Sequence, residues 1–277
     1  MLKIGDYNTL KIDRATSVGF YLTDGQGNDV LLPNKYIKKH FKVGNEITVF
    51  IYKDYEQRWI ATTLNPWIKI NEFASLRVRS VSDKGAFLEW GLEKDIFVPY
   101  REQSIKMKEG FRYIVYLYED ELTNRLVASS KINKFLNNEN FDLEPGSEVD
   151  LLIFETTLLG FNAIINQKYK GLIYHNEIFQ EIKIGNKLKG YIKNIREDNS
   201  IDLSLQPKGF ERLEQGAEKI LNYLQEHKGI LYLTDDSSPE DIQRVLLMSK
   251  KNFKKSIGIL YKKKLITLNQ SSISLIK

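Results

Sequence analysis

Residues 76–88 read LRVRSVSDKGAFL, and this stretch is the most informative part of the chain about its fold. Leu76 and Val78 alternate with Arg77 and Arg79, which is typical of a strand with one buried and one solvent-facing side. The Asp-Lys-Gly that follows has the turn chemistry that suits positive φ angles. Apolar residues resume after the glycine, so the segment predicts two short strands joined by a turn.

A glycine close to an aromatic residue recurs at three places. Gly19, Gly85 and Gly160 are separated by 66 and 75 residues. A second glycine precedes a strand-like run in each copy, at positions 44, 110 and 185, with the same two separations. Two landmarks that shift by equal amounts indicate that one unit is repeated three times.

Each repeat contains four or five short strands, rich in β-branched and aromatic residues, within about 65 residues. Closing such strands into a barrel removes the exposed sheet edges. We therefore predict a multidomain, mainly β protein that begins with three small β-barrels in tandem. The expected barrel boundaries are residues 1–66, 67–137 and 138–206.

The hydrophobic period changes from that of strands to that of helices after residue 209. Ser238 followed by Pro239 is a typical helix start, and Ser249 predicts the cap of a further helix. The expected elements are helices at 210–227, 239–248 and 249–264 and strands at 230–233, 265–268 and 273–276. This order predicts a C-terminal α+β domain, residues 207–277, of the winged-helix type.

The positive charge of the chain is concentrated in its last quarter. Residues 1–206 contain 28 basic and 28 acidic side chains, whereas residues 207–277 contain 13 basic and 8 acidic ones. Lys251, Lys255 and Lys262 fall on one side of the last predicted helix, opposite its apolar side. Clustered cations are typical of a protein that binds a polyanion, and a solubilising surface is the alternative. Because lysine recognises charge rather than base edges, we expect contacts to the phosphate backbone with little sequence specificity.

Composition excludes several classes of protein. The chain has no cysteine, which excludes disulfides, cysteine-based zinc sites and thiol catalysis. No metal-ligand spacing or catalytic constellation is visible. No apolar run approaches the roughly 18–20 residues that cross a bilayer, and no signal peptide is visible. We therefore expect a cytoplasmic, monomeric protein that is not an enzyme, needs no metal or cofactor and has no membrane partner.

The repeats resemble a known RNA-binding domain. Residues 76–88, with their Gly-Ala-Phe triplet, resemble the opening of an S1-like domain, which is an OB-fold barrel. Residues 171–178 resemble the middle of that domain, and residues 202–205 resemble its closing strand. Three S1-like repeats followed by a winged helix resemble the conserved virulence factor B family of bacterial RNA-binding proteins, over nearly the whole chain. This resemblance implies RNA binding and an effect on post-transcriptional gene expression.

The resemblance also indicates candidate RNA-binding residues, because S1-like domains turn aromatic residues near the glycine and in the middle strand toward RNA. The residue ahead of the first glycine is never aromatic here, so the stacking surface is depleted in every repeat. The third repeat keeps the most ring-bearing candidates, although it has more acidic than basic side chains. The candidates are Tyr21, Arg77, Arg79, Phe87, Phe161, Lys168, Tyr174, His175, Lys193, Arg196, Lys251, Lys255 and Lys262.

Three classes of function remain open from the sequence. The favoured hypothesis is binding of single-stranded RNA through ring stacking and backbone charge. The second is a winged-helix regulator that binds DNA, although the expected recognition face lacks Arg, Asn and Gln in its centre. The third is a protein-interaction scaffold, which the missing aromatic positions favour. Aromatic residues in β-proteins usually fill cores, so Tyr21 and Phe87 retain that alternative as well.

Overall fold

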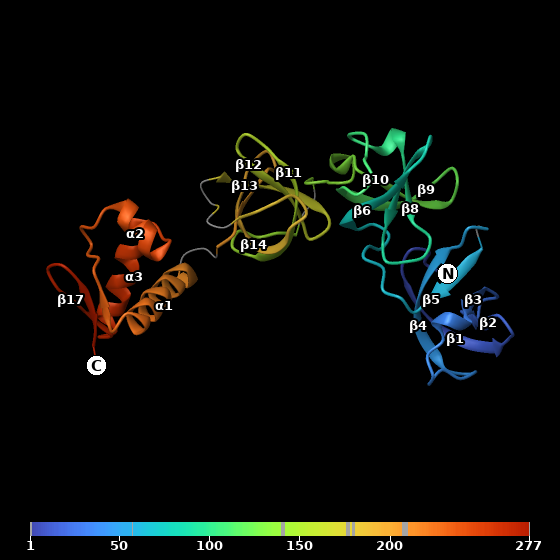
Figure 1. Cartoon of the computed structure of the whole chain (residues 1–277), viewed down its shortest axis with the longest axis horizontal. Coiled ribbons are helices and arrows are strands. Elements are labelled where there is room, and N and C mark those ends of the chain that lie inside the picture. Colours follow the sequence, from blue (N-terminus) through green and yellow to red (C-terminus); the bar gives the residue numbers. More distant parts are fainter. Residues whose placement is uncertain are drawn as a thin grey trace.

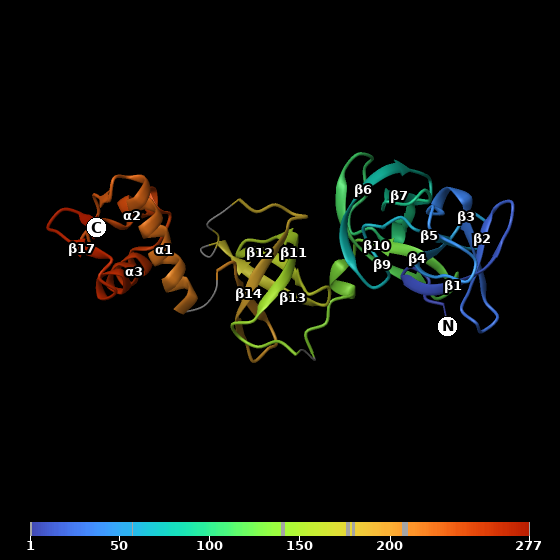
Figure 2. The same cartoon turned by 90° about the horizontal axis from the view of Figure 1, so that it is seen from below.

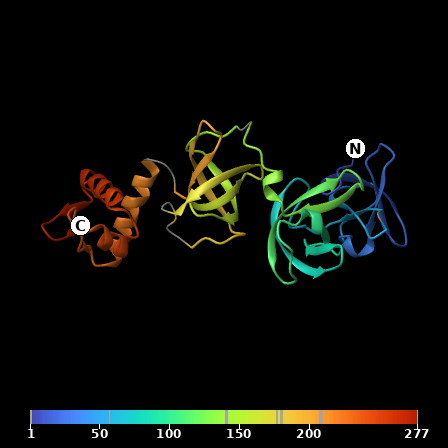
Figure 3. The same ribbon diagram turned by 90° about the horizontal axis from the view of Figure 1, so that it is seen from above.

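The computed structural model describes residues 2–56, 58–139, 142–175, 178, 181–206 and 210–276. Three β-barrels and one small α+β domain follow one another in the chain, with the first two barrels side by side at one end of the molecule and the α+β domain at the other, as Figure 1, Figure 2 and Figure 3 show. The predicted fold class, three closed barrels and a winged helix, is confirmed. None of the described helices has the length and apolar character to cross a membrane.

The barrels share one strand order, in which the third and fifth strands pair in parallel and close the sheet. Barrel 1 consists of β1 (Tyr7–Ala15), β2 (Gly19–Thr23), β3 (Asp29–Pro33), β4 (Glu46–Lys53) and β5 (Trp59–Thr62). Barrel 2 consists of β6 (Phe73–Val81), β7 (Gly85–Glu89), β8 (Ile96–Pro99), β9 (Arg112–Asp120) and β10 (Arg125–Ser129). Barrel 3 consists of β11 (Glu148–Thr156), β12 (Gly160–Ile165), β13 (Tyr169–Tyr174), β14 (Lys187–Ile195) and β15 (Ile201–Ser204). Short 3₁₀ helices are η1 (Asn34–Tyr36), η2 (Tyr100–Glu102) and η3 (Ile132–Lys134).

The two glycines that mark each repeat are needed for different physical reasons. Gly19, Gly85 and Gly160 begin the second strand, where the neighbouring strand passes so closely that a Cβ would lie 2.1, 2.3 and 1.9 Å from a carbonyl oxygen. The second glycine of each repeat adopts a left-handed φ of 92°, 83° or 94° in the turn before the fourth strand. Backbone crowding therefore explains the first landmark, and backbone conformation explains the second.

A hydrophobic cluster spans the junction between barrels 1 and 2. Phe50 and Tyr52 of β4 pack edge-on against Trp90, with ring centroids 5.7 and 6.1 Å from that of the indole. Trp90 is 1% exposed, and its indole N–H donates to the carbonyl of Lys94. Because the buried cluster is continuous across the junction, packing holds these two barrels in a fixed relation.

A second buried cluster fills the junction between barrels 2 and 3. It contains Phe73 and Ile114 from barrel 2 and Leu152 and Ile164 from barrel 3. The side-chain carbonyl of Gln167 also accepts a hydrogen bond from the Phe73 amide at 2.6 Å. Apolar contact therefore joins neighbouring barrels, in addition to the connecting segments of the chain.

The C-terminal domain has the predicted order of elements. It consists of α1 (Phe210–Glu226), β16 (Ile230–Leu231), α2 (Pro239–Leu246), α3 (Lys250–Lys262), β17 (Ile266–Leu268) and β18 (Ile273–Leu275). Ser238 and Ser249 cap α2 and α3, and each hydroxyl accepts a hydrogen bond from the backbone amide three residues further on. Helix α2 ends two residues earlier than predicted because Leu247 takes a left-handed φ of 48°. The apolar side of α3 is buried in the core of this domain, so its opposite side faces solvent.

Candidate nucleic-acid interface

The outer surface of barrel 2 has two aromatic rings side by side. The register pairs Phe87 of β7 with Phe97 of β8, and their ring centroids lie 5.1 Å apart. Both rings are half-buried, whereas Leu88 and Ile96, at the alternate positions, are buried in the barrel core. Phe87 therefore lies on the barrel surface, where solvent and a ligand can reach it.

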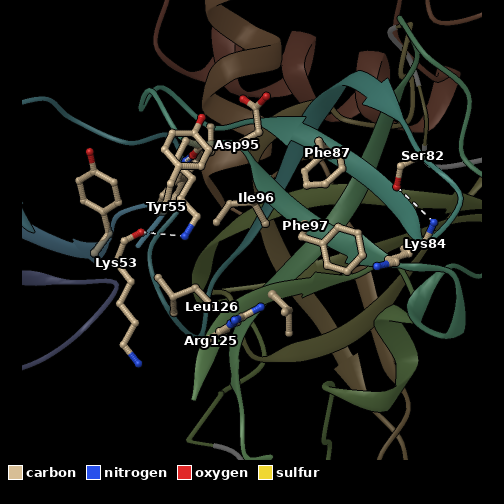
Figure 4. A pocket seen from close by; sticks show the side chains of 14 residues that line it. Lys53, Tyr55, Ser82, Lys84, Phe87, Asp95, Ile96, Phe97, Arg125 and Leu126 are labelled. Atoms are coloured by element: carbon tan, nitrogen blue, oxygen red, sulfur yellow. Dashed lines mark hydrogen bonds between the residues drawn. The ribbon is translucent and has the colours of Figure 1, made fainter. Parts of the chain in front are cut away.

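The two rings line a pocket of about 360 Å³ at the junction of barrels 1 and 2. Figure 4 shows Phe87 and Phe97 beside each other, with Lys84 and Arg125 among the side chains that line the same pocket. Within the described ranges, neither Lys84 nor Arg125 has a carboxylate at ion-pair distance. The pocket thus combines exposed ring surface with positive charge that no acidic group compensates directly.

One acidic side chain also lines this pocket. Asp95 is mostly buried, and its Oδ1 lies 3.3 Å from Nη1 of Arg79, in an ion pair without hydrogen-bond geometry. Burial raises the pKa of the Asp95 carboxyl, and the charge of Arg79 opposes that rise. Arg79 also lies 3.3 Å from Glu89, whereas Arg77 is exposed and its Nε donates to the carbonyl of Gly110 at 3.4 Å. Arg79 therefore lies at the edge of the pocket, and Arg77 is not part of its lining.

Barrel 1 has a single ring at the equivalent surface. Tyr21 of β2 pairs with Leu31, where barrel 2 has a second aromatic residue. The guanidinium of Arg14 covers the Tyr21 ring at 4.4 Å from its centroid. Asp13 and Asp29 hold that guanidinium at 2.8 Å each. Tyr21 therefore lies on the barrel surface rather than in the core, and a base that stacks on it has to displace Arg14.

The equivalent surface of barrel 3 lacks the ring pair of barrel 2. Asn162 stands where barrel 2 has Phe87, and the register aligns Glu155, Asn162, Leu172 and Asp202 across four strands. The Asn162 amide donates to Glu155 at 2.6 Å, and Arg196 donates to Asp202 at 2.9 Å. Glu155 is hydrogen-bonded to an amide and Asp202 is paired with a guanidinium, so barrel 3 has a polar network where barrel 2 has two rings.

Four of the candidates in barrel 3 form two pairs near one end of β13. The Phe161 ring packs against the barrel core, and its centroid lies 5.8 Å from the ring of His175. The guanidinium of Arg196 donates to the hydroxyl of Tyr174 and lies 6.0 Å from its ring centroid. Lys168 belongs to the turn before β13, at the other end of that strand, so it does not join this group.

The remaining candidates are exposed lysines: Lys193 on β14, and Lys251, Lys255 and Lys262 on α3, which we call the α3 lysines. Their neighbour Lys254 pairs with Asp235 at 3.8 Å. No carboxylate of the described chain lies at ion-pair distance from the α3 lysines themselves. Helix α3 therefore has one side whose positive charge is uncompensated.

Several residues that line the barrel 2 pocket were not expected from the sequence, among them Phe97, Lys84 and Arg125. The pairing of Phe97 with Phe87 could have been inferred from the sequence, because counting residues outward from the turn of the β7–β8 hairpin places the two opposite each other. The place of Arg125 in the pocket could not have been inferred in this way. Arg125 belongs to β10, which reaches the pocket through the parallel pairing with β8 that closes the barrel.

Comparisons with known proteins identify related domains and chains. The S1 domain family matches residues 4–64 and 72–131, and the CvfB-like winged helix domain family matches residues 218–275. A Bacillus subtilis protein named uncharacterized protein YitL is 30% identical, over 94% of this chain and 90% of that protein. Conserved virulence factor B of Staphylococcus aureus (strain N315) is 25% identical, over 99% of this chain and 94% of its own.

A solved structure from Streptococcus pneumoniae, described as a multidomain protein with nucleic acid binding domains, is 26% identical to this chain. The match covers 99% of this chain and 98% of that one, with a TM-score of 0.43. The matched S1 and winged-helix families are binding domains for nucleic acids, which supports nucleic-acid binding by this chain.

Proposed function

The chain belongs to the conserved virulence factor B family, and on that premise we propose that it binds single-stranded RNA without catalysing a reaction. It acts in the cytoplasm as a monomer, without metal or cofactor, in the post-transcriptional regulation of gene expression. The observation that carries this proposal is the Phe87–Phe97 ring pair, which shares its pocket with Lys84 and Arg125.

A pair of half-exposed rings suits unpaired bases. Every base has a π-face, and stacking on an aromatic side chain contributes about 1–3 kcal/mol per base. The bases of a duplex already stack on one another, so rings in a pocket can only take bases that lie outside a helix. Lys84 and Arg125 place positive charge where the phosphates of such a strand would pass. Ring stacking and charge together favour a single strand over a duplex.

The winged helix adds affinity through charge. The α3 lysines are exposed on one side of the helix and lack the planar groups that recognise base edges bidentately. Contacts from this side therefore strengthen binding to any polynucleotide to a similar degree, and binding should weaken steeply as salt concentration rises.

Barrel 3 favours a second candidate function, that of a protein-interaction scaffold. At the two ring positions of barrel 2 it has Asn162 and Leu172, and the Asn162 side chain and Asp202 hydrogen-bond to neighbours in the same barrel. A protein with a basic surface would fit such a barrel better than a phosphate backbone does.

Fluorescence anisotropy with a labelled single-stranded RNA of about 20 nucleotides tests the proposal. The matching single-stranded and duplex DNA serve as comparisons across a salt series. We expect tight RNA binding, weak duplex binding and a steep salt dependence. Equal or tighter binding of duplex DNA would replace the proposal by a DNA-binding regulator, and no binding at low salt would leave the scaffold.

A further inference from the structure

We propose that barrel 1 forms one wall of the RNA-binding pocket, so that a nucleotide bound against Phe97 also contacts Tyr55 and Lys53 of barrel 1. The inference rests on the proposed function and adds to it a composite site, built by two barrels rather than by the surface of one. The ligand class is a single nucleotide unit of the bound RNA strand.

The pocket lining shows that the two barrels meet there. Lys53, at the end of β4, and Tyr55, in the turn that follows, line the same pocket as Phe87 and Phe97. Figure 4 shows Lys53 and Tyr55 on one side of this pocket and the two phenylalanines on the other, with Ile96 and Leu126 between them. Tyr55 is 75% exposed, and the ammonium of Lys94 lies 5.8 Å from its ring centroid.

Hydrogen bonds hold this wall in place. The ammonium of Lys94, in barrel 2, donates to the carbonyls of Lys53 at 3.0 Å and Asp54 at 2.7 Å. The hydroxyl of Tyr55 donates to the carbonyl of Glu93, also in barrel 2, at 3.4 Å. These contacts cross the same junction as the buried cluster around Trp90. A wall that is already ordered costs less to organise when the ligand binds.

The chemistry of the pocket fits one nucleotide rather than a flat stack of bases. Its volume of about 360 Å³ is within the range of sites that enclose a small ligand. Rings stand on two sides of it, which suits the apolar faces of a base. The ammonium of Lys53 donates to the carbonyl of Asn124 in barrel 2, which is a further contact between the two barrels.

The test is the anisotropy assay with single-stranded RNA on the full-length chain carrying Tyr55→Ala, Phe97→Ala or both. Phe111→Ala is the matched control, because Phe111 is 61% exposed in barrel 2 but does not line the pocket. We expect Tyr55→Ala to weaken RNA binding about tenfold, the loss typical of one stacking ring, and Phe111→Ala to leave it unchanged. The double variant should lose less than the product of the two single losses, because both rings contact one nucleotide.

Three outcomes would overturn the composite site. If the Tyr55→Ala variant binds RNA as tightly as the unchanged protein, barrel 1 does not contact the nucleotide. A loss of affinity with Phe97→Ala in the same experiment would still leave the proposed function intact. If the loss of affinity in the double variant equals the product of the two single losses, the rings contact different nucleotides. An equal loss with Phe111→Ala shows a general surface effect. If Phe97→Ala also binds normally, the proposed function itself fails.

Discussion

Replacing Phe97 with alanine removes one of the two rings of the barrel 2 pocket without touching the barrel core. The neighbouring core side chains of β8, Ile96 and Val98, are buried and point the other way. The ring of Phe97 is half-buried, and its pairing with Phe87 contributes about 0.5–1.5 kcal/mol to stability beyond the area it buries. We therefore expect a folded protein with a slightly lower melting temperature.

The loss of affinity follows from the energy of stacking. One stacked base contributes about 1–3 kcal/mol, which corresponds to a factor of roughly 5–150 in the dissociation constant. Phe87 remains beside the vacated position, so we expect a value near the lower end, about tenfold. A phenyl ring has no charge, so the salt slope, which is the slope of the logarithm of the association constant against the logarithm of the salt concentration, should stay the same.

Alanine at Lys84 and Arg125 provides the contrast. Removing two cations should flatten the salt slope by about 1.4, since each phosphate contact to a single strand contributes about 0.7. Anisotropy titrations at four salt concentrations separate the loss of a stacking ring, which lowers affinity without changing the salt slope, from the loss of charge, which flattens that slope. Phe111→Ala is the control. The reasoning would be refuted if Phe97→Ala bound RNA normally, or if it changed the slope as the charge variants do.

Three further predictions follow from the structure. Alanine at all three α3 lysines should weaken binding to unrelated RNA sequences equally and flatten the salt slope by about 2, and an unchanged slope in the same titration would remove α3 from the interface. Gly160→Ala should lower stability by about 3 kcal/mol in urea unfolding, because its Cβ would lie 1.9 Å from the carbonyl oxygen of Ile173. Gly258→Ala in α3, where a Cβ meets open space, should raise stability by about 0.5–1 kcal/mol, and equal effects of the two changes would contradict the crowding argument. Asp95→Asn should strengthen RNA binding about threefold at neutral pH by removing a negative charge from the pocket. Because burial raises the pKa of Asp95, the unchanged protein should gain affinity as the pH falls through that raised pKa, and the Asn variant should lack this gain in anisotropy measurements.

Local patterns were sufficient for the elements and for their threefold repetition. The glycine landmarks predict equivalent turns and strand starts, because a left-handed φ or a close backbone approach restricts a position to glycine whatever surrounds it. The caps Ser238 and Ser249 were predictable for a similar reason, since a cap hydrogen bond joins residues three apart. The exposed side of α3 followed from the helical period alone.

The candidate site was predicted only in part, because its residues come from separate strands. Phe87 lines the pocket and Arg79 pairs with its Asp95, while Phe97 became a partner of Phe87 through the register of a hairpin. In barrel 3 the same register places Asn162 and Leu172 at the two ring positions, and Phe161 packs against the core instead. Aromatic count in a repeat is therefore a poor guide to its stacking surface.

The sequence by itself determined which elements form, where each repeat begins and which domain has the excess positive charge, because period, turn chemistry and charge are properties of neighbouring residues. Tertiary structure alone decided which side chains share a pocket. The parallel closure of barrel 2 brings Arg125 to Phe97, and packing around Trp90 brings Tyr55 of barrel 1 to the same place. Such contacts join residues from different strands and different barrels, and they depend on burial across a junction that no local period encodes.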